Sequence, residues 1–258
     1  MFYPFRQLPI NLCGLLLLLL LLLASVQITS AEDVLPSPMD LQQAYIEANG
    51  GLANIQALSS LILDGVMTNA EGEAYEFKLY KKRPDLMRMQ IDLPQGSQWT
   101  VFDGRRGFEL LLRQGEAARL IELDVDASEK AKFEAGMDGI FYHLRGRSEW
   151  FEVVSEVEIE GKPAFEIVIN EAADLPYERL WIGAEHFQEV KLRRKASLEA
   201  GREYLEEIYF SDFEQIRGVW LAKTVRFERD GNFFQSVCIN KVRANVGLFD
   251  SLFKKPKI

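Results

Sequence analysis

The amino-acid sequence predicts a mainly β (α+β) fold, built from about 10–11 antiparallel strands and two helical segments. Three observations support this prediction. From residue 60 onward, apolar residues recur with a period of two, as in strands that bury one face. Turn residues separate these runs at even intervals. A helical pattern precedes the first strand, and a second one interrupts the series.

The first helical segment follows a strong start signal. Ser37 is a good capping residue, Pro38 suits the first helical position, and Asp40 places a negative charge in the first turn. Gly50-Gly51 is expected to end the helix. A shorter helix over 52–58 should follow, with an apolar side made by Leu52, Ile55 and Leu58.

Five strands are predicted next, each defined by its alternating apolar residues. A turn over 69–72 separates the first two strands, and Arg83-Pro84 ends the second because proline cannot donate to a strand ladder. Asp103-Gly104 marks a later turn. The apolar faces of the first four strands are Leu61, Leu63 and Met67; Tyr75, Phe77 and Leu79; Met87, Met89 and Ile91; and Trp99 and Val101.

The alternation lapses between Asp124 and Arg147, where a helix ending at Gly136 and a second apolar turn near Gly146 are predicted. Strands then resume and continue nearly to the end of the chain. The remaining alternating runs lie at 151–159, 165–169, 177–182, 187–195, 202–213, 219–229 and 233–245.

Residues 1–31 are interpreted as a secretory signal peptide, and residues 32–258 as a single domain. The unbroken Leu15–Leu23 run is followed by small residues up to Ala31, where cleavage is predicted. A retained membrane anchor is the alternative, although the apolar run is short for a bilayer span. Cys13 precedes the apolar run, so a lipoprotein anchor is not expected. Cleavage leaves Cys238 as the one cysteine, without a partner for an internal disulfide.

The composition gives no support to catalysis, metal binding or nucleic-acid binding. Two histidines, His143 and His186, occur without metal-ligand spacing, and no G-x-S-x-G motif accompanies them. No phosphate-binding glycine loop is present, so no cofactor is expected. A net charge of −9 repels nucleic acid, and the short basic runs lack interleaved aromatic residues. We therefore predict a non-enzymatic protein without a metal site.

Aromatic residues are abundant, with 17 Phe, 8 Tyr and 4 Trp, and many strands are apolar on one side only. A curved antiparallel sheet would gather those sides on its concave face. The pattern is compatible with either a filled core or a hydrophobic pocket there, and it does not separate the two. Met87 and Met89 would line a pocket adaptably.

Two short motifs and the order of elements resemble the LolA/LolB-like periplasmic lipoprotein carriers. The motifs are Lys82-Arg83-Pro84-Asp85-Leu86 and Val101-Phe102-Asp103-Gly104, and the hairpin at Gly161 fits more loosely. This resemblance implies an incomplete, strongly curved antiparallel β-barrel with helices covering an apolar cavity on the concave face. It also implies that Arg83 is the arginine that latches the helical lid, since a guanidinium can bridge several carbonyls.

The same resemblance implies an exported, periplasmic carrier that binds lipid or lipoprotein acyl chains. Envelope proteins would serve as donor and acceptor, and the carrier itself would be a monomer. The predicted lining consists of Tyr75, Phe77, Leu79, Met87, Met89, Ile91, Trp99 and Val101. A non-enzymatic envelope sensor or partner-binding module on the same scaffold is the alternative, because a fold does not determine function.

Overall fold

The computed structural model describes residues 35–194, 197–199 and 202–257, which belong to one compact unit, Leu35–Ile258. Thirteen strands form a single antiparallel sheet in the order β6-β5-β4-β3-β2-β1-β15-β14-β13-β10-β9-β8-β7, and β11 and β12 pair separately. β6 and β7 are the two edges, so the sheet does not close on itself. The predicted signal peptide lies outside the described residues.

The strands follow the chain as two antiparallel series that meet where β1 pairs with β15. The first series comprises β1 (Ser60–Asn69), β2 (Ala74–Lys82), β3 (Leu86–Leu93), β4 (Gly96–Asp103), β5 (Gly107–Arg113) and β6 (Arg119–Glu122). The second comprises β7 (Phe151–Ile159), β8 (Lys162–Ile169), β9 (Tyr177–Gly183), β10 (Glu189–Arg194), β11 (Ser197–Glu199), β12 (Arg202–Tyr204), β13 (Glu206–Ile216), β14 (Val219–Arg229) and β15 (Asn232–Ala244).

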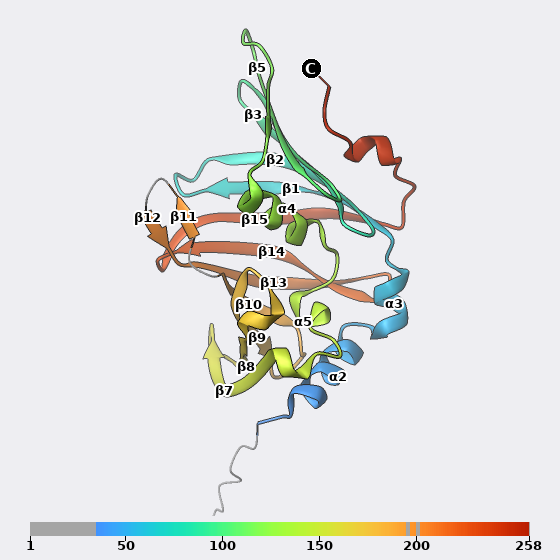
Figure 1. Cartoon of the computed structure of the whole chain (residues 1–258), viewed down its shortest axis with the longest axis vertical. Coiled ribbons are helices and arrows are strands. Elements are labelled where there is room, and N and C mark those ends of the chain that lie inside the picture. The colour runs from blue at the N-terminus through green and yellow to red at the C-terminus, as the bar shows by residue number, and fades with distance from the viewer. Residues whose placement is uncertain (1–34, 195–196, 200–201, 258) are drawn as a thin grey trace, which may run out of the picture. The chain divides into compact units, whose positions relative to one another are not determined.

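The helices are short and lie mainly on one face of the sheet, with α4 and α5 in front of the strands in Figure 1. They are α2 (Pro38–Ala48), α3 (Gly51–Ala57), α4 (Val125–Ala135) and α5 (Ile140–His143), with single 3-10 turns η1 (Ser148–Trp150), η2 (Glu171–Ala173) and η3 (Asp250–Phe253). Among the residues described, no helix is long and apolar enough to cross a membrane.

The local capping chemistry explains where the two longer helices begin. The Ser37 hydroxyl accepts a hydrogen bond from the backbone N–H of Asp40 at 3.2 Å, and Pro38 occupies the first helical turn. The Asp124 carboxylate accepts from the N–H of Ala127 at 2.8 Å in the same way for α4. Gly136 follows the last residue of α4, as the sequence predicts.

The helices divide the concave face into two filled cores. At one end, α2 and α5 pack on β7–β10 and β13, with Leu41, Phe141, Ile167 and Leu180 almost fully buried. At the other end, α4 packs on β3, β4 and β5, where Ala131 and Ala135 contact the cluster of Met87 and Phe102. Between them lie β1, β2 and β13–β15, which carry the cavity described below.

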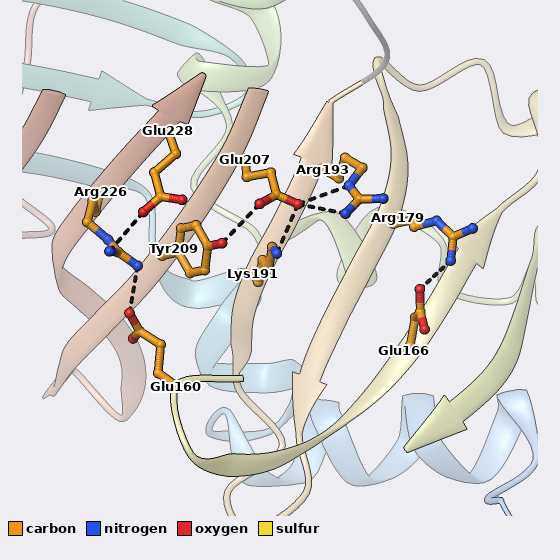
Figure 2. Close-up of polar contacts among 9 residues, drawn as sticks. All are labelled: Glu160, Glu166, Arg179, Lys191, Arg193, Glu207, Tyr209, Arg226 and Glu228. Carbon is orange, nitrogen blue, oxygen red and sulfur yellow. Dashed lines mark hydrogen bonds and ion pairs between the residues drawn. The ribbon is translucent and has the colours of Figure 1, made fainter. Parts of the chain in front are cut away.

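The outer face of the sheet, opposite the helices, holds a chain of charged side chains across β8, β9, β10, β13 and β14 (Figure 2). Glu207 accepts from Lys191 at 2.9 Å, from Arg193 at 2.7 Å and from the Tyr209 hydroxyl at 3.0 Å. The Glu166–Arg179 pair continues the chain on the next strands. Lys191 and Trp181 are buried here because neighbouring side chains cover them.

The predicted fold class is confirmed, with three differences of detail. The sheet has 13 strands against about 10–11 predicted, and these include β6, a four-residue strand that was not predicted. β11 and β12 form a separate hairpin, and β11 lies between two predicted runs. Leu52 is 37% exposed, whereas Ile55 and Leu58 are buried, so α3 turns a narrower apolar side inward than expected. Trp99 and Val101 lie on the outer face, as explained below.

We predict that Gly50 is required for the contact between α3 and the β13–β14 turn. Gly50 has φ of 110°, and an added Cβ would lie 1.9 Å from the carbonyl oxygen of Gly218. Gly50→Ala should therefore lower the free energy of unfolding by the cost of a left-handed alanine, about 1–2 kcal/mol, plus about 1–3 kcal/mol of overpacking.

Gly72→Ala is the matched control, because Gly72 has φ of 82° but nothing within 4 Å of an added Cβ. It should show the conformational cost alone. Chemical denaturation of both variants measures the difference, and equal losses would contradict the proposed contact.

Candidate functional site

A cavity of about 390 Å³ lies on the concave face between the two filled cores. Its floor is apolar and comes from β1, β2, β3, β13, β14 and β15, including Leu63, Phe77, Val225 and Val237. Its cover comes from the helices and from the segment joining α4 to α5. Its volume falls within the range of small-molecule sites. The concave face thus contains both of the arrangements that the sequence left open, a filled core at each end and a pocket between them.

Four of the predicted lining residues are in the cavity wall. Phe77 and Leu79 of β2 and Met87 and Met89 of β3 all line it. Strand pairing places them on one face, because Leu79 lies opposite Met89. Tyr75 and Ile91 share this face and belong to the same hydrophobic cluster, but they are not part of the lining.

Trp99 and Val101 lie on the outer face, so their predicted place in the lining is wrong. Met89 pairs with Thr100, and Trp99 pairs with Gln90, whose side chain points away from the cavity. The Arg88 guanidinium stacks 3.9 Å from the centre of the Trp99 ring on that outer face. Val101 pairs with Phe108, and the C-terminal segment covers this region, where Lys255 Nζ lies 5.3 Å from the Phe108 ring centre.

Arg83 joins two parts of the cover to the sheet. Its Nε donates to the carbonyl oxygen of Leu58 at 2.6 Å, and its Nη2 donates to that of Ile55 at 2.8 Å, at the end of α3. Its two Nη atoms also bind both carboxylate oxygens of Asp138, between α4 and α5, at 2.7 and 2.6 Å. The hydrogen bonds to Asp138 raise the pKa of Arg83 above its already high ordinary value, so the guanidinium stays charged. Arg83 thus ties the end of α3 and the segment between α4 and α5 to the end of β2.

Glu189 is a second link between cover and sheet, and the sequence analysis missed it. Its carboxylate accepts from the backbone N–H of Phe141 in α5 at 2.6 Å, and it also interacts with the Tyr45 hydroxyl of α2. Burial raises the pKa of Glu189 to about 7, although these hydrogen bonds act in the opposite direction. Gly139 is required beside it, because a Cβ there would lie 2.3 Å from Glu189 Oε1.

Two cations in the lining were also missed, Lys81 and Arg194. Burial lowers the pKa of Lys81 to about 8, while Glu134 and Asp138 oppose this shift. Lys81 Nζ donates to the carbonyl oxygen of Gly136 at 2.9 Å. The alternation Phe77, Leu79, Lys81 was a usable signal, since it places the lysine on the apolar face.

The residues considered for chemistry stand apart from the cavity. His143 and His186 are exposed, and neither lines it. Cys238 is an exposed free thiol on the outer face, as the alternation of Val237 and Ile239 predicted. In the described ranges, no group of three or more His, Cys, Asp or Glu side chains is placed to hold a metal ion.

No family model matches the chain, and no curated protein matches its sequence. Solved structures do resemble it. A DUF1329 family protein from Desulfovibrio piger is 16% identical, with a TM-score of 0.53 over 85% of this chain and 98% of that one. A putative outer membrane lipoprotein-sorting protein domain from Vibrio parahaemolyticus is 13% identical over 84% of this chain and 96% of that one, with a TM-score of 0.46. A LolA superfamily protein from Nitrosomonas europaea is 13% identical over 83% and 97%, with a TM-score of 0.47.

The likeness to the Desulfovibrio piger protein shows a shared fold and does not extend to function. The unclosed antiparallel sheet with helices over one face (Figure 1) is the architecture that the sequence resemblance implied.

We predict that Glu189 makes stability fall as pH rises from about 4.5 to about 7. Its pKa is raised in the folded state, so the folded protein holds this proton more tightly than the unfolded chain. The stability that Glu189 contributes is therefore fully present at pH values below its pKa in the unfolded chain. It is lost as the pH rises through its pKa in the folded protein.

The measurement compares the parent with Glu189→Gln by chemical denaturation at pH 5 and pH 8. The stability of the parent relative to the variant should fall by roughly 1–3 kcal/mol between these values. A difference that does not change with pH would contradict the burial of this carboxyl group.

We predict that Arg83→Met loosens the cover. The change leaves the Asp138 carboxylate buried without its partner, so the free energy of unfolding should fall by about 3 kcal/mol. Amide hydrogen exchange should become faster in α3 and in residues 136–140.

Lys82→Met is the neighbouring control. Lys82 Nζ pairs with Asp250, whose side chain is 73% exposed, so its loss should cost less than about 1 kcal/mol. Similar losses in the two variants would show that Arg83 has no special part in holding the cover.

Proposed function

We propose that this protein is an exported carrier of the cell envelope that binds acyl chains of lipids or lipoproteins in the concave-face cavity. The observation that supports this most is the apolar floor between two filled cores, under a cover held by Arg83. Polar bonds that join a cover to a sheet can be exchanged for bonds to water when the cover opens.

The proposed location is the periplasm, on the basis of the Leu15–Leu23 run and the small residues before Ala31. A covered apolar pocket suits a ligand that must cross water. Ten buried methylenes give a gross gain of about 8 kcal/mol, and association and ordering costs offset several of these. We therefore expect micromolar affinity.

The test uses N-phenyl-1-naphthylamine, an uncharged probe that fluoresces in apolar surroundings. The purified protein should bind it saturably, and Met89→Asp should weaken binding by at least roughly tenfold, because a carboxylate would enter the apolar wall. The matched control is Gln90→Asp, which places the same charge on the outer face of the same strand.

Saturable binding that Met89→Asp weakens and Gln90→Asp does not would support the proposal. No saturable binding, or equal effects of the two changes, would contradict it. In that case a partner-binding envelope module without a cargo would be the better description.

A further inference from the structure

The apolar cavity contains charged side chains that an uncharged acyl chain does not require. Lys81, Glu134, Asp138, Glu189 and Arg194 all line it. Charged groups are rarely placed at the wall of an apolar pocket without partners, because their desolvation is costly. Their hydrogen bonds therefore indicate which of them remain available to a ligand.

Two of the carboxylates already take part in the links between the cover and the sheet. Asp138 is held by both Nη atoms of Arg83, and Glu189 accepts from the N–H of Phe141. These two carboxylates thus already have donors from the protein.

Arg194 has a donor left over. The residue is only 5% exposed. Its Nη1 lies 3.0 Å from Glu206 Oε1 and its Nη2 donates to the Tyr177 hydroxyl at 3.3 Å, with Glu134 at 3.9 Å. Its Nε is buried and has no hydrogen-bond partner in the described part of the chain. Buried donors are normally satisfied by protein, water or ligand. Arg194 is one of the residues that line the cavity, so a ligand there could reach this donor after the guanidinium turns to uncover it.

Lys81 has spare donors as well. An ammonium group has three N–H donors, and within the described residues the hydrogen bond of Lys81 is the one to Gly136. Lys81 Nζ binds the carbonyl oxygen of Gly136, just after α4, and Arg194 Nη2 lies 3.9 Å from Glu134 in the last turn of α4, so both cations contact the C-terminal end of that helix. An anion in that part of the cavity would meet donors from β2 and β10.

We propose that the cavity selects single-tailed amphiphiles with an anionic head group, a carboxylate or a phosphate, which accepts hydrogen bonds from Lys81 and Arg194. The tail then occupies the apolar floor formed by residues such as Phe77 and Met89. This inference rests on the proposed function and adds the ligand class.

The experiment displaces bound N-phenyl-1-naphthylamine with four compounds that share a twelve-carbon tail: dodecanoate, dodecyl phosphate, dodecanol and dodecyltrimethylammonium. At least one of the two anions should displace the probe at a concentration about tenfold lower than dodecanol, and the cation should be the weakest. The stronger of the two anions identifies the head group. Acetate and inorganic phosphate should displace nothing, because they have no tail.

Three variants test the residues. Lys81→Met should reduce the preference for the anion over dodecanol by about tenfold. Glu134→Gln should increase that preference several-fold, because it removes a competing negative charge beside both cations. Lys78→Met is the matched control: Lys78 lies on the same strand but on the outer face, where it pairs with Asp64 at 3.3 Å. It should leave the preference unchanged.

Probe binding without any preference for an anionic head group would overturn this inference and leave the proposed function standing. So would equal effects of Lys81→Met and Lys78→Met. If the probe does not bind at all, the proposed function and this inference both fall.

Discussion

The guanidinium of Arg83 is the interaction on which the arrangement of the cavity depends. An unclosed sheet buries its concave face only if other elements stay in place over it, and the helices here are too short to be stable alone. Arg83 binds the end of α3 and the α4–α5 segment at once, so one side chain at a strand end fixes two separate parts of the cover. Glu189 of β10, in the other half of the sheet, holds α5 on the same face. The cavity exists where the region between these two links is not filled.

Much of this arrangement could be predicted from the sequence. The cap at Ser37, the helix end before Gly136, the alternation within the strands and the end of β2 at Arg83-Pro84 each depend on local chemistry, and each was placed correctly. The residue pattern also put Phe77, Leu79, Met87 and Met89 on a common face. These successes share a cause: each depends on neighbours in the chain or on the period of one strand.

The errors depend on how separate strands pair. Two residues connect Leu93 to Gly96, so odd-numbered residues of β3 face even-numbered residues of β4. Between β2 and β3 odd-numbered residues face odd-numbered ones. Trp99 and Val101 therefore point outward. Their strand alternates as expected, but β4 carries apolar residues on both faces, so the alternation did not show which face lies toward the cavity. Lys81, Glu189 and Arg194 were missed for a related reason: they come from β2 and β10, which meet the same cavity only in the folded protein.

The sheet ends at β6 and β7 instead of joining into a ring. In a closed barrel, the number of strands and their stagger determine the radius, so the interior cannot widen without breaking backbone hydrogen bonds. Here the distance between the two filled cores is set by how strongly the sheet twists, and a small change in twist, spread over many strands, alters it while every ladder stays intact. The volume of the interior thus depends on how far the sheet can flex. The polar links between the sheet and the cover limit how far it does flex.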